Sequence, residues 1–127
     1  MKRQFIFALA MLVGIGIGAL GVEALYAQVK PPIYMIAIND VTDAEGYVRE
    51  YTPPAAASIA AHGGVTIARG FGTIIDGSLP GERAIVVRWD SLEQLRAWRD
   101  SPEYMAARKL GDKYAKFNII AVDAVKQ

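Results

Sequence analysis

The sequence contains no cysteine, and this absence excludes several classes of protein at once. Disulfide scaffolds, zinc–thiolate sites, iron–sulfur clusters and cysteine nucleophiles all require the thiol group. Histidine is almost as scarce, because His62 is the only imidazole in the chain. The carboxylates are not spaced like metal ligands either, so we expect no metal site and no bound cofactor.

An excess of charge of one sign is also missing. The 127 residues include 14 Lys and Arg against 13 Asp and Glu, which gives a formal net charge of +1. Proteins that bind nucleic acids usually carry a clear excess of basic residues. The balance therefore argues against DNA or RNA as a partner.

The long hydrophobic run is confined to the N-terminus, where Lys2 and Arg3 precede an uncharged stretch from Phe5 to Val22. A basic start followed by a short apolar segment is the layout of a secretory signal sequence. We predict a signal peptide over residues 1–27, cleaved after Ala27, and an extended lead over residues 28–32. The protein is then exported, to the periplasm or outside the cell. A retained membrane anchor is the alternative, and it would be the protein's one contact with a membrane.

Residues 33–127 provide enough chain for one globular domain. The apolar run Ile33–Ile38 predicts a buried strand, and the capping-box spacing at Thr42 predicts a helix from about Asp43 to Ala61, kinked or broken at Pro53-Pro54. The remaining pattern predicts, in order, a hairpin of strands at 65–76 and 82–89, helices that open at Ser91 and Ser101, and a strand at 118–125. This β-α-β-β-α-β order is that of a ferredoxin-like α+β fold.

The predicted strands are apolar at nearly every position, which leaves one face of the sheet without a cover. The two helices of this fold cover the other face. A contiguous exposed apolar surface is an association site. We therefore expect a homodimer in which two sheets pack face to face.

Several short motifs follow one another in a fixed order along this domain: Ala60-Ala61-His62-Gly63-Gly64, Ala68-Arg69-Gly70, Arg83-Ala84-Ile85-Val86-Val87, Asp90-Ser91-Leu92-Glu93, Trp98 and Ser101-Pro102-Glu103-Tyr104. Together they resemble the domain-of-unknown-function family 1330, within the dimeric α+β-barrel superfamily, from Tyr34 to Val125. The resemblance implies a dimeric α+β barrel. Neighbouring families include cofactor-free monooxygenases, muconolactone-type isomerases and haem enzymes, but the family itself has no established reaction and assigns no catalytic residue.

The predicted hairpin carries the candidate site. If Asp76 pairs with Arg83, Arg69 lies opposite Asp90 and Phe71 lies opposite Arg88. This register gathers Arg69, Arg88 and Asp90 on one face of the sheet, where charges must be paired or must line a wet cavity. We predict these three as ligand-binding residues for an anionic or carbonyl group. A structural ion pair between Arg69 and Asp90 is the alternative.

His62 has a structural interpretation that outweighs a catalytic one. It ends a predicted helix in front of Gly63-Gly64, where the helix macrodipole favours an imidazole. Ser58 lies one helical turn earlier, but the sequence places no carboxylate beside the pair. A catalytic triad is therefore not expected.

Two hypotheses for the function follow. In the first, the protein is a small-molecule binder or a cofactor-free enzyme of monooxygenase or isomerase type, whose pocket lies between sheet and helices or between two sheets. In the second, it is a non-catalytic dimeric module of the cell envelope, and the interface itself is the function. The lack of convergent acid and base residues favours the second, while the charged strand face favours the first.

The export hypothesis predicts a new N-terminus. Mass spectrometry of the native protein from the envelope fraction should show a chain that begins at Gln28, because the apolar segment is removed on export. An intact Met1 in the membrane would indicate an anchor instead. Intact protein in the cytoplasmic fraction would contradict export altogether.

Overall fold

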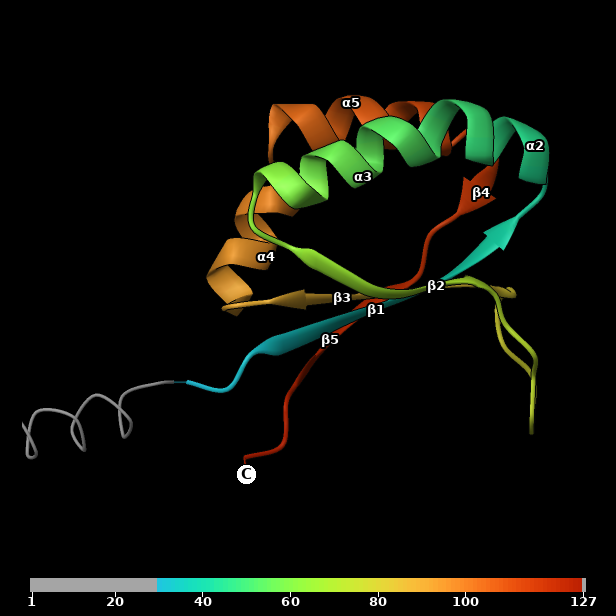
Figure 1. Ribbon diagram of the computed structural model, residues 1–127. Coiled ribbons are helices and arrows are strands. Elements are labelled where there is room, and N and C mark those ends of the chain that lie inside the picture. The colour runs from blue at the N-terminus through green and yellow to red at the C-terminus, as the bar shows by residue number, and fades with distance from the viewer. Residues whose placement is uncertain (1–29, 127) are drawn as a thin grey trace, which may run out of the picture. The chain divides into compact units, whose positions relative to one another are not determined.

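The computed structural model describes residues 30–126, so the predicted signal peptide lies outside the described residues. One antiparallel sheet has all the helices on one of its faces (Figure 1). The elements are β1 Ile33–Val41, α2 Ala44–Gly46, the π-helix η1 Tyr47–Tyr51, α3 Thr52–Ala61, β2 Val65–Phe71, β3 Arg83–Trp89, α4 Leu92–Arg99, α5 Pro102–Gly111, β4 Ala115–Lys116 and β5 Ile119–Asp123.

The order of the strands confirms the ferredoxin-like α+β prediction. The sheet runs β2-β3-β1, and the far side of β1 pairs with both β4 and β5. The last strand, predicted as one piece over 118–125, is therefore split. Asn118 fills the break, because its backbone N–H donates to the Asn39 side chain at 3.3 Å and its own amide donates to the Ile38 carbonyl at 3.1 Å.

The first helix differs from the prediction at its start and at its prolines. Asp43, rather than Thr42, caps it, and the Asp43 carboxylate accepts a hydrogen bond from the Gly46 N–H at 3.1 Å. The helix also continues through Pro53 and Pro54 without a break. The wide turn of η1, in which the Thr52 N–H donates to the Tyr47 carbonyl, comes directly before the prolines. Such a turn relieves the clash between a proline ring and the preceding carbonyls.

Helices α4 and α5 begin directly after Ser91 and Ser101, as the sequence predicts. The Ser91 side chain accepts from the Gln94 N–H at 3.1 Å, and the Ser101 side chain accepts from the Tyr104 N–H at 3.2 Å. Gly63 ends α3 with a φ of +87°, a conformation that favours glycine. None of the helices within residues 30–126 has both the length and the apolar character that a membrane span requires.

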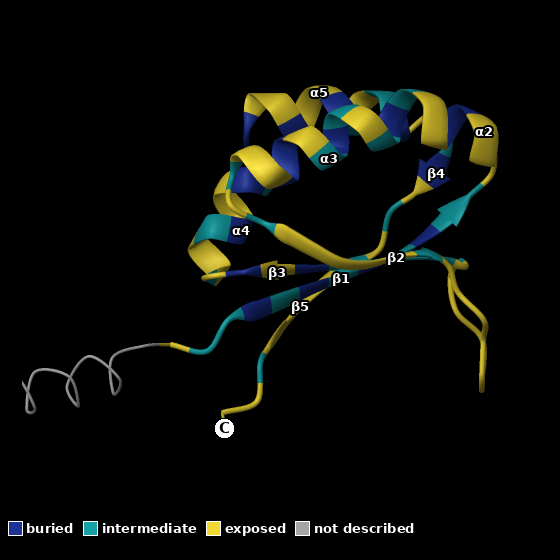
Figure 2. Cartoon of the chain, in the orientation of Figure 1, coloured by how far each residue is buried: buried dark blue, intermediate teal, exposed yellow. Residues whose placement is uncertain are grey.

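The core lies between the helices and the sheet and is built from aromatic side chains (Figure 2). Trp89 of β3 is fully buried, and its ring centroid lies 5.3 Å from that of Trp98, which in turn lies 4.0 Å from Tyr104. Gly64 lets the Trp89 ring approach closely, because an added Cβ would lie only 2.8 Å from it.

The register predicted for the hairpin is wrong. Arg69 pairs with Ile85, and Val65 pairs with Arg88. A β-bulge between Thr66 and Ala68 shifts the pairing. The tight loop at 77–81 is also replaced by a longer connection, residues 72–82, which the Gly72 N–H closes by donating to the Glu82 carbonyl at 2.6 Å. Each side chain of β2 therefore has a different partner from the one predicted.

The second face of the sheet carries no helix from residues 30–126 (Figure 1). Ile120 and Val122 of β5 are 60% and 46% exposed, and the bulged Ile67 is 52% exposed. Tyr34 and Ile36 of β1 share the face with Val122 and Ile120, because they are their direct partners in the ladder. We refer to this surface as the open face.

Candidate functional site

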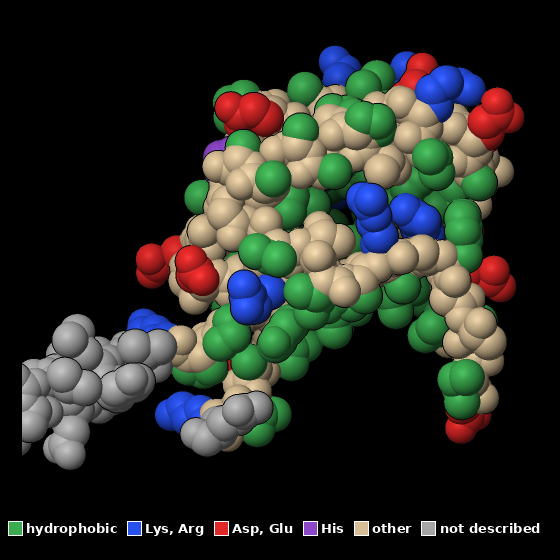
Figure 3. Space-filling view, in the orientation of Figure 1, with side chains coloured by type: hydrophobic (Ala, Val, Ile, Leu, Met, Phe, Trp, Pro, Cys, Tyr) green, Lys and Arg blue, Asp and Glu red, His purple; other side chains and the backbone are tan. Residues whose placement is uncertain are grey.

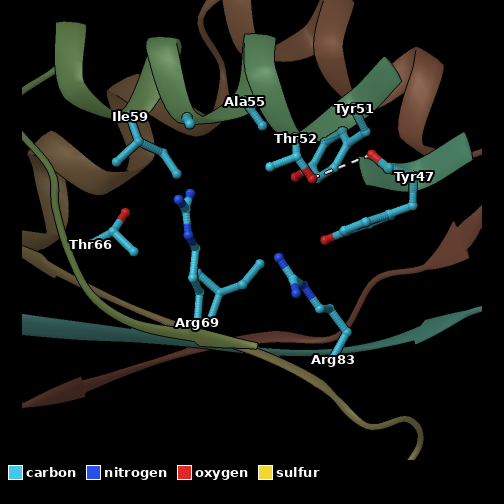
Figure 4. A pocket seen from close by; sticks show the side chains of 10 residues that line it. Tyr47, Tyr51, Thr52, Ala55, Ile59, Thr66, Arg69 and Arg83 are labelled. Carbon is cyan, nitrogen blue, oxygen red and sulfur yellow. Dashed lines mark hydrogen bonds between the residues drawn. The ribbon is translucent and has the colours of Figure 1, made fainter. Parts of the chain in front are cut away.

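A pocket lies on the other side of the sheet, beneath η1 and α3 (Figure 4). Side chains from two helical elements form its roof and strands β2 and β3 form its floor. Its lining residues are Tyr47, Tyr51, Thr52, Ala55, Ala56, Ile59, Thr66, Arg69, Arg83 and Ile85. The space-filling view shows basic side chains gathered at a hollow between the helical layer and the sheet (Figure 3). We call this cavity the helix–sheet pocket.

Arg69 and Arg83 both rise from the sheet into the pocket (Figure 4). In the ladder Arg69 pairs with Ile85 and Phe71 pairs with Arg83, so the two arginines occupy diagonal positions on one face. Like charges at neighbouring positions of a sheet repel each other. Within the described residues, neither guanidinium forms a salt bridge, since the pairs present join Arg49 to Glu45, His62 to Glu103 and Arg108 to Asp112.

Arg83 is held by aromatic rings instead of by a carboxylate. Its Cζ lies 5.8 Å from the ring centroid of Tyr47 and 5.4 Å from that of Phe71, distances typical of cation–π contacts. Its Nε is buried and has no hydrogen-bond partner within the described residues. A buried donor without an acceptor costs free energy, so the position of Arg83 is unfavourable by itself.

The two tyrosines of the pocket are neutral. Burial, the largest effect, raises the pKa of the Tyr47 hydroxyl, although Asn39 and Arg83 act in the opposite direction. Burial also raises the pKa of Tyr51, whose hydroxyl lies 3.0 Å from that of Tyr104. Both phenols therefore keep their protons at ordinary pH.

The structure separates the three residues predicted for the site. Arg69 lines the helix–sheet pocket. Arg88, which pairs with Tyr34 and Val65, is exposed on the open face. Asp90 lies beyond the end of β3 and is exposed as well, while its backbone N–H donates to the Gln94 side chain at 2.8 Å. The predicted common face and the alternative Arg69–Asp90 ion pair are both wrong, because the bulge in β2 and the longer connection change the register.

Sequence reasoning missed Arg83 as a site residue, although the sequence held a signal for it. Successive side chains of a strand point to opposite faces, so Arg83 shares a face with Ile85, Val87 and Trp89. The large apolar members of that series mark the packed face. An arginine at its end must therefore lie under the helices.

His62 lies outside the helix–sheet pocket. Its Nε2 lies 3.4 Å from the Glu103 carboxylate, and the Glu103 pKa is lowered first by a backbone hydrogen bond and then by His62. Ser58 does not face His62, because it accepts from the Trp98 indole N–H at 3.0 Å and donates to the Ala55 carbonyl at 2.7 Å. The geometry favours the structural interpretation of His62. Across residues 30–126, no three acidic or histidine side chains lie together in a way that could hold a metal ion.

Comparison with family models identifies the domain. The model of a domain of unknown function, DUF1330, matches residues 32–125. The chain belongs to the DUF1330 family. This confirms the resemblance expected from the sequence, and it assigns no activity, since the family is defined without one.

Solved structures show that this DUF1330 domain shares the ferredoxin-like fold of several bacterial proteins. A protein of unknown function from Rhodopseudomonas palustris is 17% identical, with a TM-score of 0.64 over 82% of this chain and 94% of that one. SnoaB, a cofactor-independent oxygenase from Streptomyces nogalater, is 11% identical, with a TM-score of 0.58 over 76% and 96%. A dimeric protein of unknown function from Bacteroides fragilis is 15% identical, with a TM-score of 0.53 over 73% and 96%. No curated protein matches the chain.

Proposed function

We propose that the domain binds a small organic anion in the helix–sheet pocket. The observation that carries this proposal is the pair Arg69 and Arg83, two guanidiniums that face one pocket without a carboxylate partner in the described part of the chain. Guanidinium groups form their strongest hydrogen bonds with carboxylates and similar oxyanions. A bound anion would also offset the repulsion between the two charges.

The walls of the pocket favour a ligand with an apolar body. Ala55, Ile59 and Ile85 line it together with the ring of Tyr51. Apolar walls with a few convergent polar groups are the usual composition of a small-molecule site. The two arginines would orient the charged end of the ligand and the walls would cover the rest.

Cofactor-free oxygenase or isomerase chemistry is the second candidate. The observation in its favour is the fold that the domain shares with SnoaB, which is described as a cofactor-independent oxygenase. The lining of the helix–sheet pocket contains neither a carboxylate nor a histidine. Removal of a proton from a substrate near neutral pH needs such a base within hydrogen-bond reach. Binding is therefore the function that the geometry supports best.

The open face supports a homodimer, the form we propose for the exported protein. Its exposed isoleucines and valines, with Arg88 beside Tyr34, form a largely apolar surface of the kind that soluble monomers rarely leave in water. The Bacteroides fragilis protein of the same fold is described as dimeric. This arrangement leaves the helix–sheet pocket of each subunit on the side away from the interface. A non-catalytic envelope module, in which the dimer itself is the function, is the alternative.

Substitution on the open face tests the dimer. Light scattering of the chain that begins at Gln28 should give about twice the monomer mass. Ile120→Lys should produce the monomer, because a charge cannot be buried without a partner in an apolar interface. Met105→Lys is the matched control, since Met105 is similarly exposed, at 56%, but lies on α5. A wild-type monomer at micromolar concentration would contradict the proposal.

Calorimetry with benzoate tests the binding function. Arg69→Gln and Arg83→Gln should each weaken binding by about tenfold or more, because a hydrogen bond to a charged group is worth about 1.5–3 kcal/mol. Arg96→Gln, an exposed change on α4, is the control and should bind like the wild type. Arg88→Gln tests the site predicted from the sequence. Loss of binding in Arg88→Gln with full binding in Arg83→Gln would move the site to the open face.

A further inference from the structure

The orientation of the buried Asn39 amide determines whether the Tyr47 hydroxyl can donate a hydrogen bond in the helix–sheet pocket. Asn39 at the end of β1 is 1% exposed, and its Oδ1 accepts a hydrogen bond from the Asn118 backbone N–H at 3.3 Å. A backbone N–H can only donate, so the amide atom that faces it must be the oxygen. The amide nitrogen then faces Tyr47 and donates to its hydroxyl oxygen at 3.2 Å.

This arrangement leaves the proton of the Tyr47 hydroxyl free to point elsewhere. The hydroxyl already accepts from Asn39, and it carries one proton of its own. Its other polar neighbour is Arg83, which has no acceptor atom. Figure 4 shows the hydroxyl end of Tyr47 directed into the pocket toward the Arg83 guanidinium. Asn39 and Arg83 can both only donate to this hydroxyl, so neither takes up its proton.

The other hydroxyl groups near η1 are already engaged. Tyr51 pairs with Tyr104, and the Thr52 hydroxyl donates to the Tyr47 backbone carbonyl at 3.3 Å. The polar groups offered to a ligand at this end of the pocket are therefore the Tyr47 O–H and the N–H groups of Arg83, with Arg69 across the floor. Each of them has a proton to donate, and the Thr66 hydroxyl, which can also accept, lies beyond Arg69.

We infer that Tyr47 is a specificity-determining residue that donates a hydrogen bond to the same ligand oxygen as Arg83, so that the site selects ionised oxygens: carboxylates and the anions of acidic hydroxyl compounds. The inference rests on the proposed function and narrows its ligand class. A neutral hydroxyl would bring a proton into a cluster of donors, whereas an oxyanion only accepts. The site therefore binds an acidic phenol or enol as its anion.

The titration of a coloured phenol measures this preference for the anion directly. Binding that favours the anion lowers the pKa of the bound hydroxyl, and a tenfold preference equals one pH unit. Absorbance titration of para-nitrophenol with the Gln28-initiated protein in excess should show the phenolate band appearing about one pH unit lower than in buffer. If the titration midpoint of bound para-nitrophenol is unchanged or raised, the inference is overturned. This test needs only the wild-type protein.

The variant Tyr47→Phe tests whether the Tyr47 hydroxyl causes this preference for the anion. This variant should weaken the binding of benzoate about tenfold and reduce the shift of para-nitrophenol, while nitrobenzene, a neutral probe, should bind as it does to the wild type. Tyr114→Phe is the matched control. It removes another tyrosine hydroxyl, one that donates to Glu50, and neither Tyr114 nor Glu50 lines the pocket, so the binding of both anions should be unchanged.

The outcomes separate this inference from the proposed function. If benzoate binding depends on Arg69 and Arg83 but Tyr47→Phe binds both anions like the wild type, the inference is overturned and the proposed function stands. If neither benzoate nor para-nitrophenol binds the wild-type protein, both are overturned. An equal loss for nitrobenzene and benzoate in Tyr47→Phe would show a change in packing, and it would also overturn the inference.

Discussion

The alternation of side chains along β3 is the constraint on which the rest of the molecule depends. Trp89 is completely buried beneath the helices, where it begins the run of aromatic contacts that forms the core. The two-residue period of a strand then brings Val87, Ile85 and Arg83 to the same face. A guanidinium therefore reaches the inner side of the sheet because the strand that carries it must bury its tryptophan.

That constraint explains why the pocket is both apolar and positively charged. Arg83 cannot turn toward the open face, and Arg69 lies diagonally from it on the same inner face. Two unpaired charges beside buried rings are unfavourable for an empty pocket, because electrostatic repulsion is stronger where water is partly excluded. Residues that lower the stability of the fold in this way are commonly found at ligand-binding or catalytic sites.

The sequence predicted the elements of the fold well, because strong local signals mark them. Ser91 and Ser101 cap helices, Gly63 ends one, and the order of strands and helices leads directly to the ferredoxin-like arrangement. The hairpin register could not be predicted in the same way. The connection between the strands covers residues 72–82, so Phe71 pairs with Arg83 rather than with Arg88, and the bulge at Ile67 shifts the pairing once more at Thr66 and Val65. Neither the length of the connection nor the bulge has a distinct sequence signal. The candidate site failed for that reason: Arg83 was missed, and Arg69 was grouped with Arg88 and Asp90 although it lies on the inner face of the sheet. Tyr47 also required the structure, because its role depends on Asn39 and Asn118, which are far apart in the sequence.

The central claim is that the helix–sheet pocket holds an organic anion between Arg69 and Arg83. NMR spectra of the arginine side-chain Nε–H groups, recorded during a titration with benzoate, test it most directly. The account predicts that the signals of these two arginines shift together and saturate at one common affinity, while those of Arg88 and Arg96 stay in place. Shifts confined to the exposed arginines, or shifts of all of them that never saturate, would contradict it.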